Sequence, residues 1–186
     1  SVERLLPLIV DHARRAIGAE GSIYVADPDR QWLQEACTSW PESQGGRPFG
    51  IGVAGVCAET RRGLVVNDYP KWSKANPASL ARGARHVMAE PFLSRTRLLG
   101  VIAMARRDAA ARFDERDQAV LRRFAVHAAL ALNNAIVYSE ANQRRSGAEA
   151  LARMARALSE APELATAGAQ VVGSVRELFG LRWTLR

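Results

Sequence analysis

Residues 50–55 read G-I-G-V-A-G, which matches the pattern G-x-G-x-x-G of dinucleotide-binding loops. In such loops an acidic residue about 20 positions later binds a ribose hydroxyl, and Asp68 follows Gly50 by 18 positions. A dinucleotide loop also needs a buried strand before it and a long helix after it. The preceding P-E-S-Q-G-G-R-P-F cannot form that strand, and R-R-G follows Gly55 after a short segment. The sequence around these glycines therefore argues against a dinucleotide-binding loop.

The cysteines and histidines are the other residues that could carry chemistry. They are Cys37, Cys57, His12, His86 and His127, all far apart in the sequence. Their spacing includes no H-x-x-x-H or C-x-x-C pattern, so nothing local predicts a metal site. Two interpretations of the cysteines stay open. They are small buried residues, or one is a reactive thiol of depressed pKa that works with His86.

The composition indicates a globular protein with a packed core, because 48% of the residues are hydrophobic and 24% are charged. The net charge is +7, and Lys71 and Lys74 are the only lysines among the 26 basic residues. The arginines occur as scattered doublets with acids between them, which favours a solvated surface over a nucleic-acid-binding face. No apolar run reaches the length of a membrane span. Two thiols do not make a disulfide framework, so we expect a reducing, cytoplasmic setting.

The apolar periodicity predicts helices alternating with β-hairpins. We expect helices at 3–17, 53–60, 77–83 and 113–143, and a further one after Gly147. We expect strands at 21–27, 32–40, 63–68, 85–94 and 97–106. The segment 41–50 is rich in proline and glycine, and 69–77 contains two prolines, so both are expected to be mostly irregular.

The helix over 113–143 is longer than a domain of this size can cover. Asp114 is expected to cap it, with Asp117 completing a capping box. The overhanging part is expected to pair with another helix. We predict a dimer bundle formed by the first and last helices, with Leu6, Ile9, Leu132 and Ile136 in the interface.

The C-terminal segment repeats the order of elements seen near the start. A-I-G-A-E-G-S-I-Y-V (16–25) and L-F-G-L-R-W-T-L (178–185) both place an apolar residue and a glycine between a helix and a strand. We predict a domain at 1–140, a helical linker at 141–160 and the beginning of a second domain at 161–186. The chain would then be a fragment of a longer multidomain protein.

Three segments resemble the GAF domain family, the small-molecule sensor modules of bacterial signalling proteins. They are GIGVAGVCAETRRGLVVNDYP (50–70), VMAEPFLSRTRLLGVIAMAR (87–106) and FDERDQAVLRRFAVHAALALNNAIVY (113–138). The resemblance covers about residues 2–140. It implies an α+β fold with a six-stranded antiparallel sheet flanked by helices. In such a fold Gly50, Gly52 and Gly55 are expected to serve a turn and a close packing contact.

The resemblance also implies a ligand site between one sheet face and a lid, here 40–55 and 68–85. The lid is rich in aromatic residues, which could line a pocket or form a small core that fixes the loop. His86 and Glu90 lie on the adjacent strand, where they could bind a polar ligand or face solvent. The candidate ligand-binding residues are Trp40, Phe49, Asp68, Tyr69, Trp72, His86, Met88 and Glu90.

The residue marks of the family's cyclic-nucleotide, bilin and methionine sulfoxide reductase members are absent or poorly matched. For a haem, His86 is the only candidate axial ligand, and the identity of any cofactor stays unknown. The resemblance implies a non-catalytic sensory module that binds a small molecule, dimerises and signals to an output domain in the same chain. The alternative is a thiol-dependent redox enzyme on the same scaffold, using Cys37 or Cys57.

Overall fold

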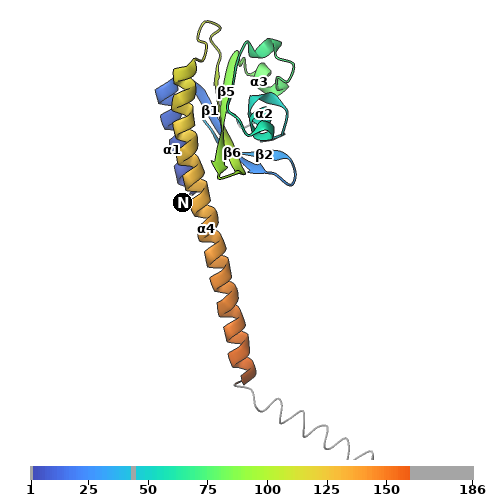
Figure 1. The fold of residues 1–186 in the computed structure, drawn as a ribbon, viewed down its shortest axis with the longest axis vertical. Helices are drawn as coiled ribbons and strands as arrows, with labels where there is room; N and C mark the ends of the chain where they lie inside the picture. Colours follow the sequence, from blue (N-terminus) through green and yellow to red (C-terminus); the bar gives the residue numbers. More distant parts are fainter. Residues whose placement is uncertain (1, 43–44, 160–186) are drawn as a thin grey trace, which may run out of the picture. The chain divides into compact units, whose positions relative to one another are not determined.

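The structure is a computed structural model that describes residues 2–42 and 45–159. The chain divides into two compact units, residues 1–137 and 138–186, and the sheet lies wholly in the first (Figure 1). The helices are α1 (Val2–Ile17), α2 (Gly52–Thr60), α3 (Pro77–Ala81) and α4 (Glu115–Ser159), with a 3-10 turn η1 at Tyr69–Lys71. The strands are β1 (Glu20–Asp27), β2 (Trp32–Thr38), β3 (Gly46–Pro48), β4 (Leu64–Asn67), β5 (His86–Ser94) and β6 (Arg97–Arg106).

The six strands form one sheet in the order β3-β2-β1-β6-β5-β4, and every neighbouring pair is antiparallel. The two predicted hairpins, β1–β2 and β5–β6, are confirmed. They join through the β1–β6 pair, in which Ile23 lies opposite Ile102 and Tyr24 opposite Val101. The predicted α+β fold with a six-stranded antiparallel sheet is therefore confirmed.

Each face of the sheet packs on its own layer of helices (Figure 1). Ile23, Met88 and Ile102 belong to a buried cluster that includes residues of α1 and α4. Tyr24, Val87 and Val101 belong to a second cluster that includes α2 and Tyr69. Alternate residues of one strand point to opposite faces, so the same strands supply both clusters. We call these the helix face and the lid face.

The residues of α1 and α4 that were predicted to form the dimer interface pack in the core of their own chain. Leu6, Ile9 and Leu132 are at most 7% exposed and belong to the helix-face core, and Ile136 packs against it. The apolar stripe seen in the sequence is thus the stripe that covers the sheet. A helix of this kind buries one stripe against its own core, so a contact with a second chain needs a different stripe.

Helix α4 begins with the predicted capping box. The Asp117 amide donates to Asp114 Oδ1 at 2.8 Å, and the Asp114 amide donates to Asp117 Oδ2 at 3.3 Å. The predicted interruption near Gly147 is wrong, because α4 continues to Ser159. A single glycine costs a helix interior only about 1 kcal/mol. The predicted second domain at 161–186 lies outside the described residues.

The segment 41–50 is not wholly irregular, as had been predicted. Gly46–Pro48 forms the edge strand β3, in which Arg47 lies opposite Leu33 of β2. An edge strand uses the hydrogen-bonding groups of only one side, so Pro48 is tolerated there. This strand brings the Arg47 side chain over the lid face.

Candidate functional site

The glycines of G-I-G-V-A-G have structural roles. Gly50 and Gly52 have φ values of 78° and 66°, a backbone conformation that favours glycine. A Cβ atom at Gly55 would lie 2.6 Å from the carbonyl oxygen of Pro48. The motif therefore turns the chain from β3 into α2 and packs α2 closely against that turn, as expected.

The lid that follows β4 is fastened by its own backbone and by Tyr69. The buried Tyr69 hydroxyl accepts a hydrogen bond from the Asn76 amide at 2.7 Å, and the Gly52 amide donates to the carbonyl of Lys74 at 2.7 Å. The Asn76 side chain caps α3 by accepting from Ala78 N at 2.9 Å. The lid is thus tied both to η1 and to the start of α2.

Beneath the lid, Arg47 of β3 packs on Tyr24 of β1. Arg47 Nη2 donates to Tyr24 Oη at 2.7 Å, and the guanidinium carbon lies 4.5 Å from the centre of the tyrosine ring. Both residues are buried. Burial raises the pKa of Tyr24, and the Arg47 charge acts in the opposite direction. This is a hydrogen bond combined with a cation–π contact inside the lid-face core.

A small cavity of about 30 Å³ adjoins this pair. Its lining combines apolar residues, among them Val53, Ala54, Val87 and Ala103, with two tyrosines and two serines. The serines are Ser22 and Ser79, and the tyrosines are Tyr24 and Tyr69. A space of this size accommodates one or two water molecules.

Trp40 also lines this cavity, and two arginines lie over its ring. The guanidinium carbon of Arg107 is 4.7 Å from the ring centre, and that of Arg82 is 5.5 Å from it. Arg82 also donates to the carbonyl of Glu42. The side of the cavity at Trp40 is therefore bordered by positive charge.

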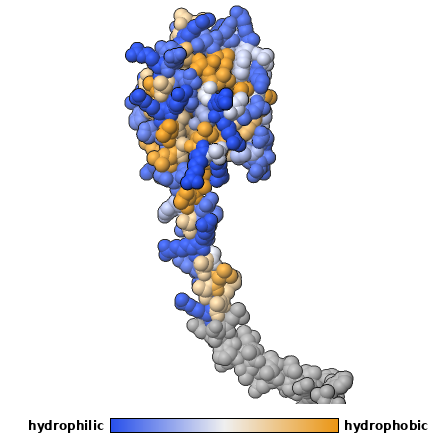
Figure 2. Space-filling model, in the orientation of Figure 1, coloured by the Kyte–Doolittle hydropathy of each residue, from blue (hydrophilic) through white to orange (hydrophobic). Residues whose placement is uncertain are grey.

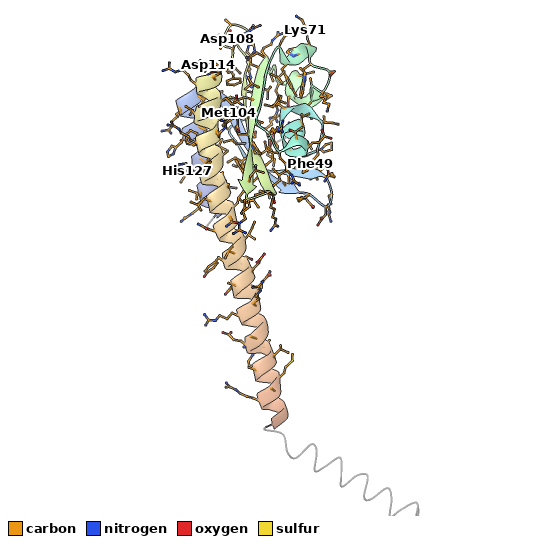
Figure 3. The ribbon with its side chains drawn as sticks, viewed as in Figure 1. Phe49, Lys71, Met104, Asp108, Asp114 and His127 are labelled. Carbon is orange, nitrogen blue, oxygen red and sulfur yellow. The ribbon has the colours of Figure 1, made fainter. Side chains whose placement is uncertain are left out.

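The remaining lid residues of the predicted site differ in burial, since two pack against the lid-face core and one is exposed. Phe49 and Trp72 are half-buried and pack against the lid-face cluster, and the Trp72 and Tyr69 ring centres are 6.0 Å apart. In Figure 3 the labelled Phe49 lies on the side of α2, whereas His127 lies on α4 on the other side of the sheet. Asp68 is exposed, forms an ion pair with Lys71 at 3.1 Å, and has a φ of 126°. It does not line the cavity.

The structure separates His86, Met88 and Glu90 from the lid. Met88 lies in the helix-face core, and Glu90 Oε1 accepts a hydrogen bond from Gln118 Nε2 of α4 at 2.9 Å. His86 Nε2 lies 3.0 Å from the carbonyl oxygen of Ala109, in the loop before α4. Their position beside the lid was predicted wrongly, because it is the odd-numbered residues Val87 and Ala89 that reach the lid face.

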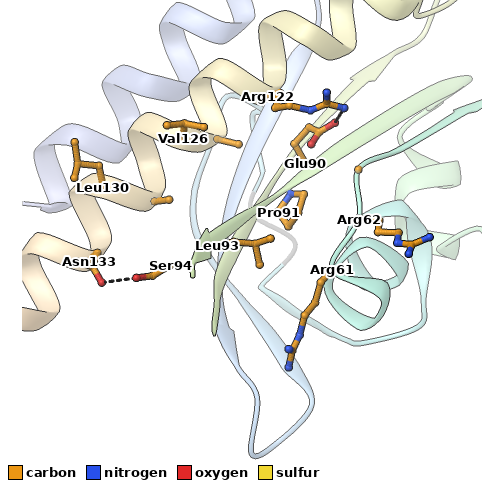
Figure 4. A pocket seen from close by; sticks show the side chains of 13 residues that line it. Arg61, Arg62, Glu90, Pro91, Leu93, Ser94, Arg122, Val126, Leu130 and Asn133 are labelled. Atoms are coloured by element: carbon orange, nitrogen blue, oxygen red, sulfur yellow. Dashed lines mark hydrogen bonds and ion pairs between the residues drawn. The ribbon is translucent and has the colours of Figure 1, made fainter. Parts of the chain in front are cut away.

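Glu90 lies instead at a surface pocket of about 690 Å³ between α4, β5 and the turn after α2 (Figure 4). Arg122 Nη2 is 3.5 Å from Glu90 Oε1, and Ser94 Oγ donates to Asn133 Oδ1 at 2.9 Å. Arg61 and Arg62 lie on the far side of this pocket. The Glu90 carboxylate is therefore already bonded within the chain.

The two cysteines lie on opposite faces of the sheet. Cys57 of α2 is in the lid-face core, whereas Cys37 of β2 packs against the helix-face core. Burial raises the pKa of Cys37 to about 11. Burial, and then the Glu90 charge, raise the pKa of Cys57 still further. Both shifts are opposite to the depression that activates a thiol.

Sequence reasoning missed Tyr24, Arg47, Arg82 and Arg107. Tyr24 stands in a strand rich in β-forming residues, where an aromatic residue is ordinary. Arg47 is one of many arginines and lies in a segment predicted to be irregular. Nothing in the sequence distinguishes these arginines from solvated ones. Among the residues that the structure describes, no group of three or more histidine, cysteine or acidic side chains could hold a metal.

A family model described as a GAF domain matches residues 1–133, so the chain belongs to the GAF domain family. No curated protein matches the sequence. Within residues 2–42 and 45–159, no helix is long and apolar enough to cross a membrane.

Solved structures with the same fold come from several kinds of protein. The chain is similar to the GAF domain of a phosphoenolpyruvate-protein phosphotransferase from Coxiella burnetii, with 20% identity, a TM-score of 0.68, and coverage of 75% of this chain and 87% of that one. It is also similar to the free methionine-R-sulfoxide reductase from Neisseria meningitidis, with 22% identity, a TM-score of 0.64, and coverage of 72% and 78%. A GAF domain/HD domain protein from Geobacter sulfurreducens gives 23% identity, a TM-score of 0.62, and coverage of 72% and 93%.

Proposed function

We propose that this chain is a non-catalytic sensory GAF module that binds a small molecule under the lid and passes the signal on through α4. One observation carries the proposal. The lid covers a cavity whose lining includes a buried arginine on a tyrosine, together with hydroxyl-bearing residues of the sheet and the lid. Polar groups converging in a mostly apolar enclosure are the ordinary composition of a small-molecule site.

The thiols favour a binding role over a redox role. A catalytic cysteine needs a depressed pKa and a base nearby, whereas both pKa values are raised by burial. His86, the base of the alternative hypothesis, hydrogen bonds to the loop before α4. Cys57 belongs to the cluster on the other face of the sheet. Similar folds include both a phosphotransferase GAF domain and a reductase, so the support for a binding role comes from the residues of this chain.

A dimer of these modules would use the outer surface of α1 and α4. Leu5, Leu8, Val126, Leu130 and Val137 are large apolar residues that are 42–63% exposed. Val126, Leu130 and Val137 follow the spacing of a coiled-coil seam. A groove of about 450 Å³ runs between the two helices beside Leu5 and Leu130. Figure 2 shows hydrophobic residues at the surface of the folded unit among hydrophilic ones.

Strand β6 supplies a connection between the cavity and these helices. Ala103 and Ala105 of β6 line the cavity, and Arg106 follows at the end of the strand. Arg106 donates to the carbonyls of Ile17 and Gly18 at the end of α1. It also pairs with Asp117 in the first turn of α4. A ligand that shifts β6 would therefore act on both helices. The size of this effect depends on how much more tightly the ligand binds the shifted arrangement of β6 than the unshifted one.

Native mass spectrometry of the chain purified under non-denaturing conditions tests the proposal. We expect the wild type to retain a small molecule and Ala103→Leu, which fills the cavity, to lose it. Ala110→Leu adds the same side chain at an exposed position and is the matched control. Identical retained masses in the wild type and Ala103→Leu would contradict binding under the lid.

A further inference from the structure

We infer that the cavity under the lid binds a small carboxylate with a short apolar body, held by Arg47. This inference rests on the proposed function and specifies its ligand. Among the described residues that line the cavity, Arg47 is the single charged side chain. Its guanidinium already donates to a neutral phenol, Tyr24 Oη, inside the core. A carboxylate is a stronger acceptor for the same donors.

The electrostatic surroundings of the cavity are predominantly positive. Arg47 and Arg82 both act on Tyr24 to lower its pKa against the larger effect of burial. Glu35 lies opposite Tyr24 on β2 and acts in the other direction, but it is not among the lining residues. Arg107 and Arg82 over Trp40 add positive charge at the border. An anion is therefore favoured over a cation or a neutral molecule.

The shape of the donor set favours a carboxylate over a phosphate. A guanidinium is a planar fork that matches the two oxygens of a carboxylate. A phosphate dianion is normally bound by several cations or by the amides of a helix N-terminus. Among the described residues that line the cavity, Arg47 alone has a charged side chain, and Val53, Ala54 and Val87 are apolar. Such a wall fits a short hydrocarbon body.

The size of the cavity limits the ligand. In the structure it holds about 30 Å³, the space of one or two waters. An acetate-sized ion would replace that water, and a longer carboxylate would require movement of the lid. The lid hydrogen bonds from Asn76 to Tyr69 and from Gly52 to Lys74 would respond to such a movement.

The test compares isosteric acids and amides. Acetate and butyrate are titrated against acetamide and butyramide at matched concentrations and ionic strength, with the Trp40 indole NH signal followed by NMR. A hydrogen bond to a charged group predicts binding of the acid about tenfold to a hundredfold tighter than binding of the amide. Inorganic phosphate is titrated in parallel to separate a carboxylate site from general anion binding.

Arg47→Gln is expected to bring the acid-to-amide ratio close to one. Arg62→Gln removes the same charge at an exposed position of another pocket and should leave the ratio unchanged. If Arg47→Gln fails to fold, the comparison of acids with amides on the wild type still tests whether the site prefers a carboxylate.

Three results would overturn the inference: equal binding of acid and amide, binding of phosphate as tight as that of butyrate, or no response of Trp40 to any probe. None of them touches the proposed function. The proposed function is tested separately, by native mass spectrometry of the wild type and Ala103→Leu.

Discussion

Arg106 and Asp117 form a two-point ion pair that joins the end of β6 to the first turn of α4. Arg106 Nη1 lies 2.9 Å from Asp117 Oδ2, and Arg106 Nη2 lies 3.3 Å from Asp117 Oδ1. The two side chains are only 14% and 20% exposed. The same guanidinium donates to the carbonyls of Ile17 and Arg112 and packs 4.3 Å from the ring centre of Phe113. One side chain therefore holds α1, β6 and α4 together.

Arg106→Lys should destabilise the fold, because a lysine keeps the charge but cannot reproduce the fork. We expect a loss of about 1–3 kcal/mol in the free energy of unfolding, measured by urea denaturation. Arg15 pairs with Asp11 at 2.9 Å but is 70% exposed. Arg15→Lys is therefore the control, and it should change stability by less than about 0.5 kcal/mol. Equal effects of the two substitutions would contradict the role given to Arg106.

Leu132 and Leu130 are two residues apart on α4, and replacing each with a charged residue should affect different properties of the protein. Leu132 is 7% exposed in the helix-face core, so Leu132→Glu should unfold the domain or cost several kcal/mol. Leu130 is 59% exposed, so Leu130→Glu should keep the fold and weaken self-association.

Circular dichroism and light scattering distinguish these two outcomes. Ile51→Glu makes the same kind of change at another exposed apolar residue, 43% exposed at the start of α2, and should leave the association state unchanged. A wild-type protein that stays monomeric at high concentration would refute the proposed helix interface.

The thiols should be slow nucleophiles in the folded protein. A Cys37 pKa of about 11 leaves roughly one molecule in a thousand as thiolate at pH 8. Alkylation of Cys37 by iodoacetamide should therefore accelerate about tenfold per pH unit up to about pH 11. Cys57 should react more slowly still, because it is more deeply buried. The unfolded chain in urea supplies the reference rate, and rapid labelling at pH 7 in the native state would support the redox alternative.

The local elements of this fold were predictable because short-range rules determine them. The capping box of Asp114 and Asp117, the two hairpins and the roles of Gly50 and Gly52 all follow from neighbouring residues. Strand β3 was missed because a three-residue edge strand with glycine and proline has almost no local signal.

The side of β5 that points to the lid was predicted wrongly, and the reason is a different one. This strand is covered on both sides, so apolar residues occur at odd and even positions alike, and alternation does not say which side faces the lid. The stripe of α1 and α4 was likewise recognised, but periodicity alone does not tell whether a sheet or a second chain covers it. Arg47 was missed because its importance comes from Tyr24, a residue 23 positions away in sequence.

The most direct test of a ligand site under the lid is amide hydrogen exchange at Gly52 and Asn76. Their amides make the bonds that close the lid, to Lys74 and Tyr69. The protein as purified is compared with the same protein refolded after removal of bound small molecules. We predict slower exchange at both amides in the protein as purified, with no change at Arg61 and Arg62 beside the other pocket. Unchanged exchange at Gly52 and Asn76, or protection confined to Arg61 and Arg62, would contradict it.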